Sequence, residues 1–558
     1  MSATTTGPAL PLRQPAAAYP TYPDDVRATY RRLGYWTQET FADFVADRTT
    51  RFADRTAVVG RRATGEEVRW TYAELAAQAE LVARRLTALG VRPGDRVVLA
   101  LPNVVEYVAA VCGLFRMGAV PVFALPTHRE RELTQFCTLA DAAALVVAGG
   151  EAGVDHVALH AEVSRLVGER GVEPPALVDV RTWSCAPEAD LPPAPQAPQG
   201  SESLAFLQLS GGTTGISKLI PRMAADYLYS VRESATICEL DADTVMLVVL
   251  PASHNFPMSS PGILGVLHVG GTVVLARDPS PRTGFGLIER ERVTITALVP
   301  PLAQAWISAA RRRTPDLSSL RTLQVGGAKL NDVVAREVGP VLGARLQQVF
   351  GMAEGLVNYT RADDPDELVL TTQGRPISPH DEVRVVDADD RDVPDGEEGA
   401  LLPRGPYTIR GYYRADEPGG PNQTSFTADG FYRTGDLVRR LPSGHLVVTG
   451  RDKDQINRAG EKIATDEIEG LLLAHPDVLD AVAVGLPDDR LGERICVVVR
   501  VEPGRPRPDD LAAHLEAAGL ATYKMPDSYE FLDELPETHV GKTSRRELRR
   551  LLADHLTR

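Results

Sequence analysis

Short apolar runs alternate with amphipathic helical patterns through most of this 558-residue chain. In one clear case, residues 96–101 (RVVLAL) read as a strand, residues 105–117 as a helix and residues 120–125 (VPVFAL) as a second strand. Strand, helix and strand in this order build a sheet with helices on its faces. We therefore expect an α/β fold.

Two changes in composition indicate how the chain is divided. Residues 187–201 (PEADLPPAPQAPQGS) are rich in Pro and lack periodicity, which predicts an exposed connector. Near residue 450, a strand pattern at 445–449 gives way to the polar stretch GRDKDQINRAGEKI and then to a helical pattern at 465–473. The last part reads as a small α+β unit with strands at 481–484 and 496–501, so we predict two domains, 1–451 and 452–558.

Charge and hydropathy exclude several classes of protein. There are 60 Lys and Arg against 75 Asp and Glu, a net charge of −15, whereas nucleic-acid binding needs clustered basic residues. The longest apolar stretch, 97–126, contains Pro102, Asn103, Glu106 and Arg116, and the N-terminus lacks the pattern of a secretory signal. We expect a cytoplasmic protein with neither nucleic acid nor membrane as a partner.

The cysteines predict no metal or redox motif. They are far apart in the sequence and odd in number, which is typical of ordinary thiols in a reducing compartment. They are Cys112, Cys137, Cys185, Cys238 and Cys496.

A glycine-rich segment is the strongest local indication of chemistry. Residues 209–222 (LSGGTTGISKLIPR) follow the apolar run LAFLQL and hold three glycines, four hydroxyl residues and a lysine between Ser210 and Lys218. Such a loop can approach a polyphosphate with backbone N–H groups and hydroxyls. It is not a Walker P-loop, because Ser217 stands where that motif needs glycine. A solvent-exposed loop is the alternative interpretation.

Four further motifs follow in order: FGMAEG (350–355), YRTGDL (432–437), GRDKDQINRAGEKI (450–463) and LPETHVGK (535–542). Together with the loop they resemble the adenylate-forming (ANL) superfamily of acyl- and aryl-CoA ligases, nonribosomal adenylation domains and luciferases. The segments HNFPMSSPG (254–262), GGAKL (326–330) and QQVFGMAEGLVNYTR (347–361) look most like the stand-alone aryl-acid AMP ligases. The resemblance implies a large N-terminal domain of βαβ subdomains with a β-barrel-like subdomain, and a small mobile α+β domain.

The same resemblance implies a two-step reaction that uses ATP and Mg²⁺. An aryl carboxylate such as salicylate or 2,3-dihydroxybenzoate attacks the ATP α-phosphorus, which forms aryl-AMP and releases pyrophosphate. The aryl group then passes to the phosphopantetheine thiol of a free-standing aryl carrier protein in siderophore or nonribosomal peptide biosynthesis. Only sixteen residues follow Lys542, so we expect no fused carrier domain.

Particular residues match the catalytic and nucleotide-binding positions of the family. Lys542 is expected to bridge the carboxylate and the α-phosphate, and His254 to gate or order the site. Glu354 is the expected Mg²⁺ ligand, because Mg²⁺ prefers one or two carboxylates together with phosphate oxygens. Asp436 and Arg451 are expected at the ribose. The other expected ATP contacts are Ser210, Gly211, Gly212, Thr213, Thr214, Gly215, Lys218, Gly327, Ala328, Phe350, Gly351, Met352 and Ala353.

The expected aryl-acid site is a flat apolar slot. Asn255 can donate its amide hydrogens to the carboxylate and meet an ortho hydroxyl. Phe256 stands where 2,3-dihydroxybenzoate enzymes usually carry Tyr, which favours salicylate or a heteroaryl acid such as hydroxypicolinate, whereas two other residues match the dihydroxybenzoate pattern. The remaining lining residues are Ser260, Gly327, Val349 and Val357.

The resemblance also predicts a hinge at Lys453, about which the small domain rotates between the two half-reactions. The basic run at Arg545, Arg546, Arg549 and Arg550 is either a docking point for an acidic carrier or a solvated helix face. Two alternative functions stay open at this point. One is an aryl-CoA ligase, and the other is a non-catalytic nucleotide-binding regulator.

Overall fold

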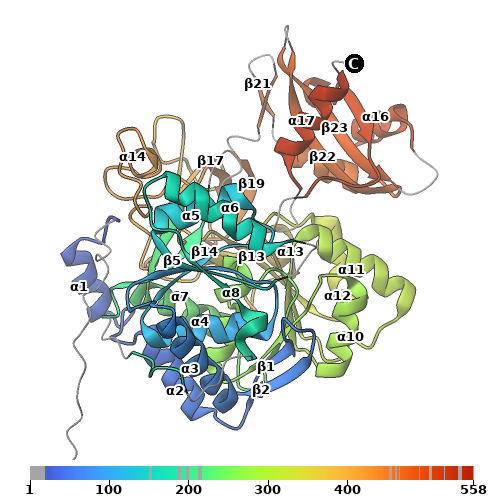
Figure 1. Ribbon diagram of the computed structural model, residues 1–558. Coiled ribbons are helices and arrows are strands. Elements are labelled where there is room, and N and C mark those ends of the chain that lie inside the picture. The colour runs from blue at the N-terminus through green and yellow to red at the C-terminus, as the bar shows by residue number, and fades with distance from the viewer. Residues whose placement is uncertain are drawn as a thin grey trace, which may run out of the picture. The chain divides into compact units, whose positions relative to one another are not determined.

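A computed structural model describes most of the chain (Figure 1). The described residues are 19–149, 154–184, 190–195, 200–210, 217–451, 455–458, 461–463, 465–488, 491–501, 506–518, 520, 522–537 and 543–556. They fall into two compact units. The first comprises Met1–Gly212, Ile216–Tyr229 and Ile409–Pro421, and the second comprises Thr213–Gly215, Ser230–Thr408 and Asn422–Arg558.

The first unit is built on a six-stranded sheet in the order β6-β5-β3-β4-β7-β8. Its strands pair in parallel, except that β7 and β8 are antiparallel. The expected helix at residues 105–117 is confirmed as α4 (Val105–Met117). The strands are β3 Arg96–Ala100, β4 Val120–Phe123, β5 Ala142–Val147, β6 Ala176–Asp179, β7 Leu204–Leu209 and β8 Leu219–Met223.

Burial explains why these apolar runs become central strands. Every residue of β3 is buried, as expected for a parallel strand covered on both faces. Helix α4 is buried at every position except Arg116 and ends at Gly118, whose φ of 71° provides a left-handed C-cap. The other elements of this unit are α1 Asp24–Arg32, α2 Phe41–Arg51, β1 Thr56–Arg61, β2 Glu67–Thr71, α3 Tyr72–Ala88, α5 Glu130–Ala140 and α6 His156–Glu169.

The second unit contains strands in the order β15-β14-β13-β12-β11-β9-β10. The strands from β10 to β13 are parallel, and β14 and β15 add antiparallel pairs at the β13 edge. The bounds are β9 Val245–Val248, β10 Thr272–Leu275, β11 Ile295–Leu298, β12 Thr322–Gly326, β13 Arg345–Gly351, β14 Val357–Tyr359 and β15 Arg375–Pro376. Its helices are α8 Asn255–Ser259, α9 Gly262–Val269, α10 Pro281–Glu291, α11 Pro300–Arg313, α12 Asp332–Leu342 and α13 Asp366–Thr371.

A second sheet of this unit is antiparallel, in the order β16-β17-β18-β19. Its core cluster is formed by Leu356, Val385, Leu401, Val438 and Leu446, and Phe350 and Met352 pack against that cluster. The predicted strand at 445–449 is confirmed within this sheet as β19, which begins one residue later and ends two residues later. The elements are β16 Glu382–Val386, β17 Glu398–Arg404, α14 Pro421–Thr424, β18 Asp436–Arg440 and β19 Leu446–Arg451.

The C-terminal part of the second unit has an α+β arrangement of its own. In Figure 1, α17 lies against the sheet of β22 and β23. The predicted helix at 465–473 is confirmed as α15, and both predicted strands lie inside longer ones. The elements are β20 Ile456–Arg458, β21 Glu461–Ile463, α15 Thr465–Leu473, β22 Val478–Asp488, β23 Gly492–Val501, α16 Pro508–Ala517, β24 Ser528–Phe531 and α17 Arg545–Leu556.

Alternation along β22 explains how this small sheet is covered on both faces. Ala481 and Ala483 belong to a cluster with Leu472 of α15 and Leu511 of α16. Their neighbours Val482 and Val484 belong to a second cluster with Leu548 and Leu552 of α17. Successive side chains of a strand point to opposite faces, so one strand supplies two cores. The fold is thus mixed α/β with a large N-terminal part and a small C-terminal part, as expected.

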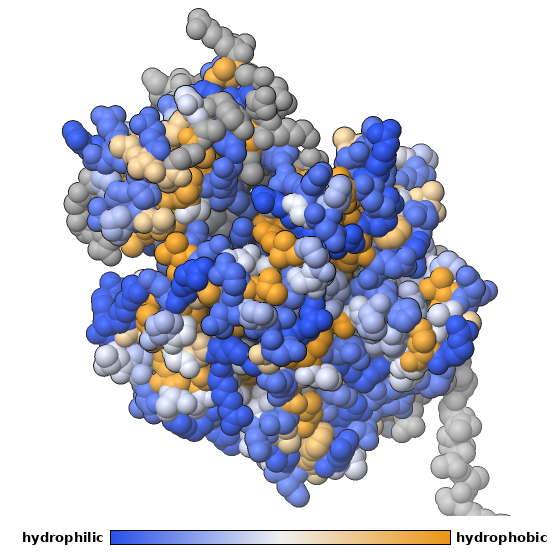
Figure 2. Space-filling model, turned by 180° about the vertical axis from the view of Figure 1, so that it is seen from behind, coloured by the Kyte–Doolittle hydropathy of each residue, from blue (hydrophilic) through white to orange (hydrophobic). Residues whose placement is uncertain are grey.

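The surface carries few large apolar side chains among the described residues. Those more than a third exposed are Leu33, Leu89, Val157, Val333 and Leu551, which come from separate helices or helix ends. The face in Figure 2 is mainly hydrophilic, with hydrophobic residues in small separate groups. Across the ranges that the structure describes, no helix combines the length and apolar character needed to cross a membrane.

Candidate active site

The candidate site lies at the carboxyl ends of β12 and β13, where ligands bind in open α/β sheets. Gly326 ends β12 and pairs with Val349 of β13. Gly327 follows with a φ of 83°, which favours glycine, and Ala328 is exposed. The small residues GGA therefore form a sharp turn at this edge of the sheet.

Gly326 leaves room for an aromatic ring. A Cβ atom added at Gly326 would lie 2.7 Å from the carbonyl oxygen of Val349 and 3.0 Å from Cζ of Phe256. The Phe256 ring, which α8 carries, is buried directly against the end of β12. Of the predicted aryl-acid residues, Phe256 and Val349 are thus brought together at Gly326.

Strand pairing extends this wall. Val349 pairs with Tyr359 of β14, and Gly351 pairs with Val357. Paired residues point to the same face of a sheet, so Val349, Val357 and Tyr359 share the face on which Phe256 lies. Ser260, which follows α8, is also buried.

Tyr359 is a residue that the sequence analysis missed. Its side chain is fully buried, and burial raises the pKa of its hydroxyl well above the usual range. Two serine hydroxyls lie close to the Tyr359 hydroxyl and act to lower its pKa. They belong to Ser234, in α7 (Ala224–Ile237), and to Ser260. Neither makes a hydrogen bond of good geometry with the Tyr359 hydroxyl, which has no partner within the described part of the chain. The signal available was its position two residues after Val357, on the same strand face.

His254 caps the helix that carries the slot residues. Its Nδ1 accepts a hydrogen bond from the backbone N–H of Phe256 at 3.3 Å, at the N-terminus of α8. Asn255 is the first residue of that helix and is half-buried. This cap gives His254 a structural task beside the gating role expected for it.

The turn between β13 and β14 carries the expected metal and adenine residues. Its backbone is closed by two hydrogen bonds, from Met352 N–H to the Leu356 carbonyl at 3.0 Å and from Gly355 N–H to the Met352 carbonyl at 3.1 Å. Glu354 is 6% exposed, whereas Gly351 is exposed and Ala353 half-buried. Phe350 packs against the core of the β16–β19 sheet.

The donor set at Glu354 can be compared with the needs of Mg²⁺. Nowhere in the described ranges do three or more His, Cys, Asp or Glu side chains form a group that could hold a metal by themselves. Mg²⁺ often binds through one or two carboxylates while keeping water and phosphate oxygens as its other ligands. A single buried carboxylate at this turn fits a Mg²⁺ ion that arrives with a polyphosphate.

The two expected ribose contacts lie opposite each other on neighbouring strands. Asp436 of β18 pairs with Arg451 of β19, and Arg451 Nε donates to Asp436 Oδ1 at 2.8 Å. The Asp436 side chain is 8% exposed and that of Arg451 is 49% exposed.

In the first unit, the glycine-rich loop has a defined base. Ser210 N–H donates to the Lys218 carbonyl at 3.0 Å, and Lys218 N–H donates to Ser210 Oγ at 2.9 Å. The Lys218 ammonium lies 4.3 Å from the centre of the Tyr412 ring. Gly211, Gly212, Thr213, Thr214 and Gly215 lie outside the described residues, as do Lys453 and Lys542.

The basic run in α17 is partly engaged within the C-terminal part. One guanidinium nitrogen of Arg545 lies 2.7 and 2.8 Å from the two Glu469 oxygens and 3.5 Å from Asp466. Arg550 pairs with Glu547 at 2.5 Å. Arg545 is therefore paired with carboxylates of α15, and a docking role for this basic run stays a prediction.

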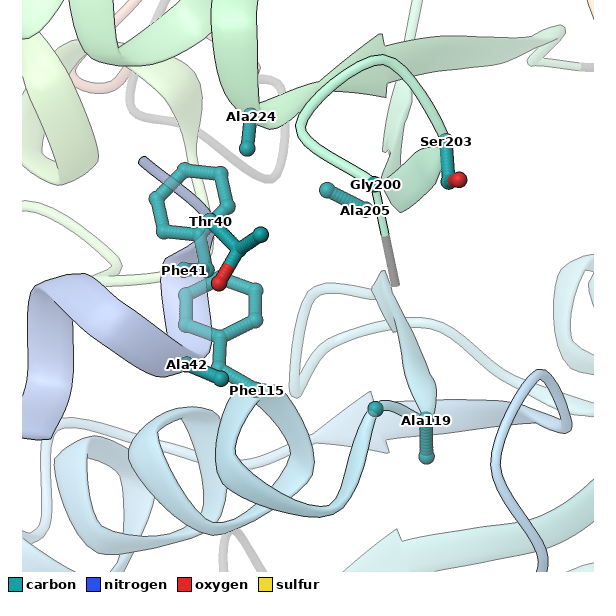
Figure 3. A pocket seen from close by; sticks show the side chains of 10 residues that line it. Thr40, Phe41, Ala42, Phe115, Ala119, Gly200, Ser203, Ala205 and Ala224 are labelled. Atoms are coloured by element: carbon teal, nitrogen blue, oxygen red, sulfur yellow. The ribbon is translucent and has the colours of Figure 1, made fainter. Parts of the chain in front are cut away.

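Figure 3 shows the residues that line a small pocket of the first unit. The pocket encloses about 340 Å³, including space open to solvent, and small side chains line most of it. Phe41 and Phe115 stack beside it with ring centres 4.2 Å apart. None of the predicted site residues lines this pocket.

Comparisons with known proteins cover nearly the whole chain. The sequence model of the AMP-binding enzyme family matches residues 45–413, and that of the AMP-binding enzyme C-terminal domain matches residues 467–542. The 2,3-dihydroxybenzoate-AMP ligase of Bacillus subtilis (strain 168) is 51% identical over 538 residues, which are 96% of this chain and 98% of that protein.

Two further relatives carry names that mention different acceptors. A salicyl-AMP ligase / salicyl-S-ArCP synthetase of Mycobacterium tuberculosis is 46% identical over 95% of this chain and 94% of that protein. A salicylyl-CoA synthase / salicylate adenylyltransferase of a Streptomyces species is 46% identical over 95% and 96%. The apo structure of MbtA from Mycobacterium smegmatis superimposes with a TM-score of 0.72 at 43% identity, covering 96% of this chain and 99% of that one.

Proposed function

The chain belongs to the AMP-binding enzyme family, and on this premise we propose that it is an aryl-acid AMP ligase. It activates a hydroxyaryl or heteroaryl carboxylic acid, such as salicylate or 2,3-dihydroxybenzoate, with ATP. It then transfers the aryl group to a carrier protein in siderophore or nonribosomal peptide biosynthesis. We place the enzyme in the cytoplasm, where ATP is available.

One observation carries this proposal: the Phe256 ring packs against Gly326, beside Val349. A backbone edge without a side chain, beside an aromatic ring and Val349, suits a planar apolar ring. The turn with Glu354 begins two residues after Val349, on the same strand. Acid and nucleotide would therefore meet at the carboxyl end of β13.

The first step needs charge neutralisation and alignment more than acid–base chemistry. A carboxylate is already ionised at neutral pH, so it can attack the α-phosphorus without a general base. Mg²⁺ held by Glu354 would reduce the negative charge of the phosphates. Asn255 would orient the carboxylate, Asp436 and Arg451 would hold the ribose, and Lys542 would bridge the two reacting groups.

We propose that residues 452–558 form the mobile domain and that Lys453 is its hinge. Lys453→Pro tests this, because proline fixes φ and prevents a large backbone rotation. Adenylation retained with thioester formation lost supports the hinge. Unchanged thioester formation would reject it.

Pyrophosphate exchange with ATP tests the proposed function directly. Salicylate, 2,3-dihydroxybenzoate, 3-hydroxypicolinate and benzoate are compared with a medium-chain fatty acid as the control. Exchange that depends on one or more of the aryl acids supports the proposal, whereas background exchange with all of them rejects it in favour of a non-catalytic nucleotide-binding protein.

The acceptor is a separate question for a second assay. The adenylating enzyme is offered a phosphopantetheinylated aryl carrier protein or coenzyme A, and the aryl thioester is measured by mass spectrometry. Faster formation on the carrier supports the proposal, and faster formation on coenzyme A makes the protein an aryl-CoA ligase.

A further inference from the structure

The turn from Gly351 to Val357 serves both substrates in the proposed function. Glu354, the proposed Mg²⁺ ligand, and Val357, a proposed wall of the aryl slot, are three residues apart on it. A shift of this turn would therefore displace both binding sites at once.

A side chain from outside the β13–β14 pair holds the end of this turn. The backbone N–H of Val357 donates to the hydroxyl oxygen of Tyr407 at 3.2 Å. The Val357 carbonyl accepts from Ile377 N–H at 3.1 Å, so both backbone groups of Val357 are engaged. Tyr407 is fully buried, which keeps water from replacing its hydroxyl.

The Tyr407 hydroxyl is itself oriented by Asp381. It donates to Asp381 Oδ2 at 2.6 Å, and the same oxygen accepts from Ser378 N–H at 3.1 Å. A hydroxyl that donates to a carboxyl group keeps its lone pairs for an N–H donor. Val357 N–H thus donates to Tyr407, and Tyr407 in turn donates to Asp381.

The residue after Tyr407 fills the space beside Gly355, the residue that follows Glu354. A Cβ atom added at Gly355 would lie 2.5 Å from Cα and 2.7 Å from Oγ1 of Thr408. Tyr407 and Thr408 therefore contact the turn at Val357 and at Gly355, both on the C-terminal side of Glu354.

We propose that Tyr407, oriented by Asp381, is a positioning residue that sets where the Glu354 carboxylate and the Val357 side chain lie. The inference rests on the proposed function for the roles of Glu354 and Val357. Tyr407 is not itself a proposed contact of either substrate. It acts through the backbone of the turn.

Tyr407→Phe tests this, because it removes the hydroxyl and keeps the ring. We expect kcat/KM for pyrophosphate exchange with the aryl acid to fall about tenfold, which is the effect expected from the loss of one hydrogen bond. The Mg²⁺ concentration that gives half-maximal pyrophosphate exchange should rise, and so should the KM of the aryl acid. Independently of activity, hydrogen exchange of a peptide covering residues 351–359 should accelerate.

Tyr107→Phe is the matched control, since Tyr107 is another fully buried tyrosine and lies in α4 of the first unit. It should lower the unfolding temperature without changing the Mg²⁺ requirement or the exchange of residues 351–359. Asp381→Asn keeps an oxygen acceptor and should preserve most activity, whereas Asp381→Ala should accelerate exchange in the same peptide.

The outcomes separate this inference from the proposed function. If Tyr407→Phe folds and changes neither kcat/KM nor the exchange of residues 351–359, Tyr407 does not position the turn. If Tyr407→Phe does not fold, Asp381→Ala takes its place. Unchanged hydrogen exchange of residues 351–359 in Asp381→Ala would then show that Tyr407 does not position the turn. Failure of the wild-type protein to use any aryl acid rejects the proposed function alone, since hydrogen exchange still reports on the turn.

Discussion

Arg451 Nε donates to Asp436 Oδ1 at 2.8 Å across the antiparallel pair β18–β19. The carboxylate is buried and the guanidinium is half exposed, so the pair presents one face to the protein and one to solvent. A charged hydrogen bond of this kind fixes the orientation of the carboxylate. The Asp436 carboxylate is therefore held in one orientation, as a ribose contact would require.

If both residues bind the ribose, their effects on ATP binding should be coupled. We expect Asp436→Ala and Arg451→Ala each to raise the KM for ATP by about tenfold or more, because each leaves a charged partner without its counterpart. The double variant should lose less than the product of the single losses, with a coupling energy of about 0.5 to 3 kcal/mol. A double-mutant cycle on the KM for ATP measures this, and independent effects would contradict the shared role.

Gly326→Ala should damage the aryl-acid site selectively. The new methyl group would meet the Val349 carbonyl at 2.7 Å and the Phe256 ring at 3.0 Å, and overpacking of this kind costs about 1 to 3 kcal/mol. The KM of the aryl acid should rise at least about fivefold while the KM of ATP stays constant. Gly286→Ala is the control, because nothing lies within 4 Å of a Cβ atom there. Equal losses for both substrates would show that Gly326 serves folding rather than the slot.

Tyr359→Phe should change selectivity between aryl acids with little effect on stability. The hydroxyl is buried beside Ser234 and Ser260 without a hydrogen bond of good geometry, so its removal costs the unliganded protein little. If a ring hydroxyl of the substrate lies near Ser260, it also lies near the Tyr359 hydroxyl. Loss of the Tyr359 hydroxyl should then lower kcat/KM for 2,3-dihydroxybenzoate about tenfold and leave kcat/KM for salicylate unchanged. Exchange kinetics with the two acids, together with the unfolding temperature, provide the measurement. Equal losses for the two acids would remove Tyr359 from the specificity of the slot.

Helices and strands with a regular hydropathy pattern could be predicted from the sequence. The helices over residues 105–117 and 465–473 are confirmed at both ends. The strands expected at 481–484 and 496–501 are parts of β22 and β23, which extend further. Both strands continue into polar residues because backbone pairing, unlike hydropathy, does not stop at a charged side chain.

Contacts between distant residues left no periodic signal in the sequence. Tyr407 and Asp381 are 26 residues apart, and Arg545 and Glu469 are 76 apart. The run RRELRR reads as a solvated face until the fold places Glu469 of α15 beside Arg545. Phe256 alone favoured a ring without a 3-hydroxyl, whereas the fold places the Tyr359 phenol on the same sheet face as Val349 and Val357. The only sequence signal for Tyr359 was its spacing of two residues from Val357, which places both side chains on one face of β14.

Asp381 predicts a pH dependence of stability. Burial raises the pKa of this carboxyl from its ordinary value near 3.8 to about 7, so between these values the folded protein holds a proton that the unfolded chain has released. The free energy of unfolding therefore decreases as the pH rises from about 4 to 7 and is steady above that range, as far as this group is concerned. Asp381→Asn cannot ionise and should lack this decrease. Urea unfolding of both proteins at pH 4.5, 6 and 8 measures the difference. We expect wild type to lose stability relative to Asp381→Asn between pH 4.5 and 8, and parallel curves would mean that Asp381 titrates at an ordinary pH.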